Sequence, residues 1–159
     1  IPFEAIAIPL YSLVSSLGWL NTFNALIVSG IANGLTVFLF RQFFAGIPTE
    51  LFEAATMDGA SRPRIYATIF MPLSKPAIVS ASLLLFVSQW EAFLWPLLSA
   101  NRPDIRMIQV VLSYINTEYT TVWNQLFAGA VIAGLIPLVL ILPLQRYYVR
   151  GISSTGIKG

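Results

Sequence analysis

Long runs of apolar residues separated by shorter polar segments dominate the sequence. The four main runs cover residues 5–17, 23–40, 77–100 and 126–144. The last three are long enough to cross a bilayer, since a transmembrane helix needs about 20 residues. The first run is too short, and we expect it to be the end of a span that begins upstream. Strict alternation of apolar and polar residues is absent, so the pattern predicts helices and not a barrel.

The composition strengthens this prediction. Hydrophobic residues make up 57% of the chain and charged residues 10%, with a mean hydropathy of +0.76, whereas a soluble domain carries about 25% charged residues. The chain has no His and no Cys. These absences exclude disulfides, imidazole or thiolate metal sites and a Ser-His-Asp type of nucleophile. The carboxylates are scattered along the chain, which disfavours an intramembrane enzyme.

The distribution of basic residues predicts the orientation. Seven of the nine lie between the second and third runs or in the C-terminal tail, namely Arg41, Arg62, Arg64, Lys75, Arg146, Arg150 and Lys158. Only Arg102 and Arg106 lie between the third and fourth runs. Because basic residues favour the cytoplasmic side, we expect the middle segment and the tail to be cytoplasmic.

The polar segment between the second and third runs predicts two short helices. The first has Thr49 as its N-cap and runs to Asp58, where Gly59 is a natural stop. The second begins at Ser61 and ends before Pro72.

This segment resembles the cytoplasmic EAA loop of binding-protein-dependent ABC permeases. The matching residues are Glu53, Ala54, Ala55, Asp58, Gly59, Ile69 and Pro72, with Met71 in place of the usual Leu. Two further stretches, Trp90–Pro96 and Gln145–Gly159, look like the sugar-type, maltose-permease-like members of this family. The resemblance therefore covers nearly the whole chain.

The resemblance implies an all-α integral membrane protein with a MetI-like permease helical bundle. We expect about three complete transmembrane helices plus a partial one, and a cytoplasmic coupling helix. Residues 1–159 would be the C-terminal part of one permease domain in the cell inner membrane, with an EAA loop at about 46–76. The chain begins at Ile1 without an initiator Met, and we expect upstream sequence.

The resemblance also implies the function, which is a non-catalytic, pore-forming subunit of an ATP-driven importer for a sugar or oligosaccharide. Its expected partners are an ABC ATPase dimer, a second permease subunit, an extracytoplasmic solute-binding protein and membrane lipid, with no nucleic acid. No cofactor is expected in this subunit, because ATP and Mg would be bound by the ATPase. Amino acids, polyamines and glycerol phosphate remain alternative solutes, and an ATP-independent transporter or channel is an alternative mechanism.

The EAA-type residues have a physical rationale in coupling. Small side chains at Ala54 and Ala55 let a helix approach another protein closely, and Glu53 can meet a basic or amide group on the ATPase. Gly59 allows a sharp turn. The alternative interpretation is an amphipathic helix that lies on the lipid surface.

Polar residues within the apolar runs are candidates for the solute path. Glu91, with Gln89 and Trp90, offers hydrogen bonds and an aromatic face for a sugar. A carboxylate that is structural at the outer interface is the alternative for Glu91. Asn33, in the second run, either lines the path or bonds to neighbouring helices.

Overall fold

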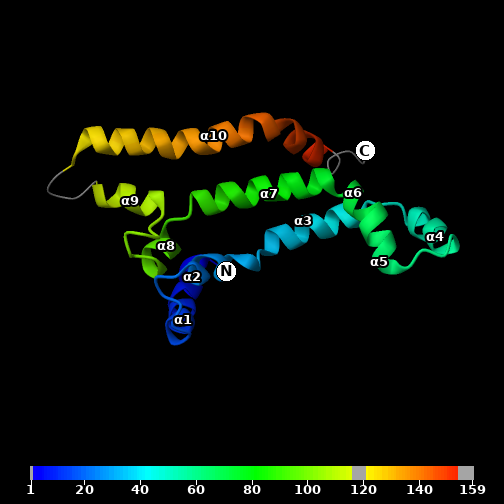
Figure 1. The fold of residues 1–159 in the computed structure, drawn as a ribbon, viewed down its shortest axis with the longest axis horizontal. Helices are drawn as coiled ribbons and strands as arrows, with labels where there is room; N and C mark the ends of the chain where they lie inside the picture. The colour runs from blue at the N-terminus through cyan, green and yellow to red at the C-terminus, as the bar shows by residue number, and fades with distance from the viewer. Residues whose placement is uncertain (1, 116–120, 154–159) are drawn as a thin grey trace. The chain divides into compact units, whose positions relative to one another are not determined.

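The computed structural model describes residues 2–115 and 121–153, with side chains described as far as Leu144. The elements of these residues are α1 (Phe3–Ser16), α2 (Phe23–Ile31), α3 (Gly34–Ala45), α4 (Thr49–Met57), α5 (Arg62–Ile65), the π-helix η1 (Tyr66–Phe70), α6 (Met71–Leu73), α7 (Lys75–Trp90), α8 (Leu94–Ser99), α9 (Ile108–Ile115) and α10 (Trp123–Ser153). Figure 1 labels the α-helices in chain order. The described residues form two compact units, one of residues up to 33 with 87–139 and one of residues 34–86 with those from 140 onward.

The first unit is held together around Trp95 of α8. Its indole Nε1 donates a hydrogen bond to the carbonyl oxygen of Ala25 in α2, at 2.9 Å. The ring of Phe3 in α1 meets the Trp95 ring edge-on, with ring centroids 6.2 Å apart. Such pairs favour association beyond the area they bury. One tryptophan therefore fixes α1 and α2 against α8.

Within the described residues, two helical segments are long and apolar enough to cross a membrane. They are Phe23–Ala45, which combines α2 and α3, and Trp123–Leu144 within α10. A third is obtained if Arg62–Leu73 and Lys75–Trp90, which are bent by 68° relative to each other, count as one span. The shorter α1 is also apolar. The helical character and the apolar segments confirm the predicted all-α membrane class.

Two predicted spans are interrupted. The run 23–40 is not one helix, because α2 ends at Ile31 and α3 begins at Gly34 and extends to Ala45. The prediction of a single helix over 77–100 is also wrong, because α7 ends at Trp90 and α8 begins at Leu94. Pro96 lies in the first turn of α8, where a proline is tolerated. In a helix that continued unbroken from α7 its ring would clash with the carbonyl of Ala92, and residues 91–93 are instead not helical.

The fourth predicted span is confirmed within α10, which contains all of residues 126–144. Its large side chains are mostly exposed, including Phe127, Val131, Ile132, Leu135, Leu138, Val139 and Leu142. Exposed apolar surface of this extent requires lipid or another apolar partner. The tail side chains from Gln145 onward, and residues 154–159 entirely, lie outside the described residues.

Candidate functional site

The helix that carries the EAA residues is α4. It begins at Thr49, and Pro48 occupies the N-cap position without a side-chain hydrogen bond. The prediction that Thr49 is the cap is therefore wrong by one residue. Pro48, with φ −58°, already has the backbone angle of a helical residue but an extended ψ of 133°, so the helix can only begin after it. Glu50 lies in the first turn, where the helix dipole favours a carboxylate.

The EAA residues occupy two sides of α4. Glu53 and Ala54 are exposed. Ala55 is buried, and so is Ile65 of α5, the helix against which α4 packs. In the described structure Ala55 therefore serves internal packing, while Glu53 and Ala54 remain available to a partner.

Gly59 ends α4 in a complete Schellman motif. Its φ is +77°, in the region that side chains disfavour. The amide of Gly59 donates to the carbonyl of Thr56, and the amide of Ala60 donates to that of Ala55, both at 3.0 Å. A Cβ added at Gly59 would meet nothing within 4 Å. The requirement for glycine is therefore conformational and not steric.

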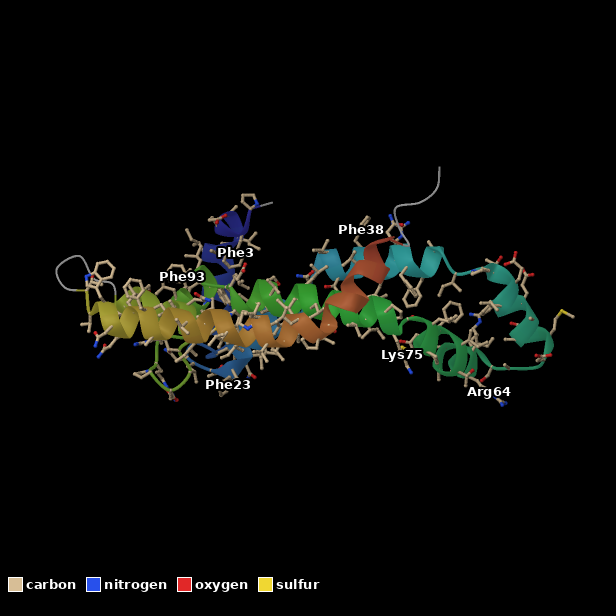
Figure 2. All side chains as sticks on the ribbon, turned by 90° about the horizontal axis from the view of Figure 1, so that it is seen from above. Phe3, Phe23, Phe38, Arg64, Lys75 and Phe93 are labelled. Carbon is tan, nitrogen blue, oxygen red and sulfur yellow. The ribbon has the colours of Figure 1, made fainter. Side chains whose placement is uncertain are left out.

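After α4 the chain runs through α5, η1 and α6 to α7. Figure 2 labels Arg64 in α5 and Lys75, the first residue of α7. The prediction that the second helix ends before Pro72 is wrong, because helical structure continues to Leu73. The π-turn explains this. The amide of Met71 donates to the carbonyl of Tyr66, five residues back, and this widened turn relieves the clash that a proline ring makes with the carbonyl four residues before it.

A corner at Ser74 directs the chain into α7. Ser74 is 1% exposed. Its hydroxyl donates to the carbonyl of Phe70 at 2.6 Å, and its own carbonyl accepts from the amide of Ile78 at 2.8 Å. Ser74 thus bonds to both helical segments that meet at the 68° bend. Sequence reasoning missed this residue, although its place between Pro72 and Pro76 was a signal.

Three EAA-type residues remain, and the first of them, Asp58, is the exposed C-cap of α4. Ile69 is half-buried in η1 and Pro72 is exposed in α6. Both therefore lie on the returning segment, away from α4 in sequence.

Among the solute-path candidates, Gln89 is brought to another helix. Its exposed side chain lies over Gly30 of α2, so that a Cβ added there would be 3.1 Å from its Nε2. Asn33 follows α2 at the break before α3 and is half-buried. Sequence reasoning did not single out Gly30, against which the end of the Gln89 side chain lies.

Trp90 and Glu91 lie where α7 ends. The indole N–H of Trp90 donates to the carbonyl of Ala133 in α10 at 2.9 Å, so its ring face, and not this donor, is what it could offer a solute. Glu91 is exposed and follows the last residue of α7. Its predicted place inside a continuous helix is therefore wrong.

The loop between α8 and α9 is organised by Asn21. Asn21 has a φ of +58°, and its Oδ1 accepts hydrogen bonds from the amides of Asn101 at 2.7 Å and Arg102 at 3.0 Å. The exposed side chains of Arg102 and Asp104 form an ion pair. The hydrogen bond from Arg102 lowers the pKa of the Asp104 carboxyl below its ordinary value.

The known proteins that this chain resembles all belong to one family of transport proteins. Residues 1–154 match the family described as binding-protein-dependent transport system inner membrane component. The chain is 34% identical, over all its length, to the arabinooligosaccharides transport system permease protein AraQ of Halalkalibacterium halodurans, of which it covers 57%. It is 35% identical, over 98% of its length, to the sn-glycerol-3-phosphate transport system permease protein UgpE of Rhizobium meliloti, of which it covers 56%. The chain thus spans about half the length of these relatives.

A solved structure agrees. The fold matches a chain in the crystal structure of a bacterial ABC transporter involved in the import of the acidic polysaccharide alginate, with a TM-score of 0.74 and 25% sequence identity. The match covers 89% of this chain and 55% of the other.

Proposed function

We propose, since this chain belongs to the family of binding-protein-dependent transport system inner membrane components, that it forms part of the pore of an ATP-driven importer and is coupled to a separate ATPase through α4. The observation that carries this proposal is the arrangement of α4. The helix presents Glu53 and Ala54 outward, packs on α5 and ends in the Gly59 turn. Such a rigid, exposed helix can transmit the movement of a docked partner.

The assembly would contain an ATPase dimer below the membrane, a second permease subunit and a solute-binding protein outside. This subunit would perform no catalysis. We assign ATP and Mg to the ATPase, and the described residues include no group of three or more His, Cys, Asp or Glu that could hold a metal ion. The charge distribution supports a cytoplasmic loop at 46–76 and a cytoplasmic C-terminus.

The proposed solute is a neutral sugar or oligosaccharide. The path candidates Asn33, Gln89 and Glu91 provide amides and a carboxylate but no cation. Amides and carboxylates bond to hydroxyl groups, whereas an anion such as glycerol phosphate would be repelled by Glu91. The Trp90 ring face would stack on a sugar ring. Thermal-shift screening of the associated binding protein tests this choice, and stabilisation by glycerol phosphate without stabilisation by sugars would contradict it.

The coupling role is tested in vesicles that contain the complete assembly. Glu53→Gln removes the carboxylate that α4 presents to the ATPase, and Glu50→Gln is the matched control, because both residues are exposed on the same helix. We expect solute-stimulated ATP hydrolysis and uptake to fall in the first variant and to stay near the wild-type level in the second. Equal behaviour of the two variants would contradict the assignment, as would wild-type uptake that needs no ATPase.

A further inference from the structure

Four phenylalanines form an aromatic cluster at the base of the segment that carries α4. The Phe44 ring centroid lies 6.1 Å from that of Phe40, 5.9 Å from that of Phe43 and 6.1 Å from that of Phe70. Phe40, Phe43 and Phe44 belong to α3, whereas Phe70 is the last residue of η1. Phe44 is therefore the centre of a contact between two elements that are far apart in sequence.

This contact brings together the two ends of residues 44–70, the segment that contains α4. Phe44 lies in the last turn of α3, and the chain then runs through α4 and α5 before Phe70 returns to it. Without the ring contact, α4 would be connected to α3 through the short linker of residues 46–48. With it, α4 and its returning segment are attached to α3 at two points.

Phe70 is also fixed on its other side. Its carbonyl accepts hydrogen bonds from both the amide and the hydroxyl of Ser74, at 2.9 and 2.6 Å. Because Ser74 in turn receives the first hydrogen bond of α7 from Ile78, Phe70 is linked to α7 through this buried corner. The side chain of Phe70 thus connects to α3 and its backbone to α7.

We infer that Phe70 is a positioning residue for transport. Through Phe70, a displacement of α4 moves α3 and α7 together. This inference rests on the proposed function, because it assumes that an ATPase moves α4. The ring contact with Phe44 transmits the displacement to α3, and the bonds to Ser74 transmit it to α7. Loss of either connection leaves an ATPase that still docks and hydrolyses ATP but moves the pore less.

The test compares Phe70→Leu and Phe44→Leu with Phe38→Leu in the complete reconstituted assembly. Phe38 is an exposed α3 residue outside the cluster, so it is the matched control. An aromatic pair stabilises by an amount that corresponds to about a two- to tenfold change in an equilibrium. We expect uptake per ATP hydrolysed to fall by about this factor in both cluster variants, with ATPase binding retained. The double variant should be no worse than Phe44→Leu alone, because that variant already removes the ring contact through which Phe70 joins the cluster.

Two further variants guard against a simple folding defect. Ser74→Ala leaves the rings intact and should lower the same ratio, by less. Phe44→Cys with Phe70→Cys should be poorly coupled when reduced and should recover when a thiol cross-linker joins the two positions, and this stretch contains no natural Cys. The inference is overturned if Phe70→Leu matches Phe38→Leu, or if cross-linking restores nothing. Failure of wild-type ATP-driven uptake would instead contradict the proposed function.

Discussion

The indole Nε1 of Trp90 lies 2.9 Å from the carbonyl oxygen of Ala133, and Ala133 stands four residues before Pro137. In a regular helix this carbonyl would accept from the amide of residue 137, but a proline has no amide hydrogen. Trp90 therefore supplies the hydrogen bond that Pro137 cannot make. This relationship explains how α10 continues through Pro137 and why α7 is fixed to it at this level.

Trp90→Phe should destabilise the full-length permease because it leaves the Ala133 carbonyl without this partner. Hydrogen bonds between membrane helices contribute about 0.6 kcal/mol on average and up to about 1.7 kcal/mol. Pro137→Ala restores an amide at that position, so the same Trp90 substitution should cost less in this background. Thermal unfolding in detergent of the four combinations checks the expectation, and an identical loss in both backgrounds would show that the carbonyl does not depend on Trp90.

Substitution of Gly59 should impair coupling in an order set by backbone conformation. At a φ of +77°, a side chain costs about 1–2 kcal/mol, but Asn tolerates this region better than other residues. We expect Gly59→Asn to retain more solute-stimulated ATP hydrolysis than Gly59→Ala, although Asn is larger. If instead activity follows side-chain size, with Ala above Asn, the glycine requirement is steric at the ATPase interface.

Asn21→Ala should loosen the loop between α8 and α9. It removes the oxygen that accepts from the amides of Asn101 and Arg102, and a hydrogen bond of this kind contributes about 0.5–1.5 kcal/mol. Asn21→Asp is the control, since it keeps an acceptor and a side chain suited to positive φ. Hydrogen exchange at those two amides should accelerate in the Ala variant and change little in the Asp variant. Unchanged exchange in the Ala variant would contradict the assignment.

Gly129 and Gly134 of α10 should respond oppositely to the same change. A Cβ at Gly129 would lie 2.6 Å from the Cδ2 of Leu112 in α9, whereas one at Gly134 would meet nothing within 4 Å. Gly129→Ala should therefore destabilise the fold by up to about 1 kcal/mol, because the end of the Leu112 side chain has to shift. Gly134→Ala should be neutral or slightly stabilising, because Ala is the better helix former. Leu112→Ala should restore the Gly129 variant, and equal thermal midpoints for the two single variants would refute this packing.

Features that depend on neighbours in sequence were predictable. The apolar run of α10, the exposed helix α4 and the turn at Gly59 all follow from local pattern and backbone preference. The end of α7 at Trp90 was not, because the apolar run continues past it and its interruption is set by Pro96 and by contacts of the tryptophans. Trp95 reaches Ala25, and Phe70 reaches Phe44. Such contacts join distant segments and leave no periodic signal.

For the candidate site too, only the features that depend on neighbours in sequence could be predicted. The EAA residues were located by their spacing, but the burial of Ala55 depends on α5, and the corner at Ser74 depends on the π-turn before Pro72. The role of Trp90 could have been suspected from Pro137, since a proline within a membrane helix leaves a carbonyl that needs a donor. Which donor supplies it could be decided only from the fold.

The interruption between α2 and α3 has a consequence for what can surround this segment in a bilayer. Residues 32–33 are not helical, yet they lie within the segment Phe23–Ala45, which is long and apolar enough to cross a bilayer. Hydrocarbon chains offer no partner to a peptide group, so irregular backbone at membrane depth is tolerated only where protein or a water-filled cavity surrounds it. The backbone around Asn33 therefore has to be covered by protein or by water, and not by lipid tails, wherever this segment lies in a bilayer.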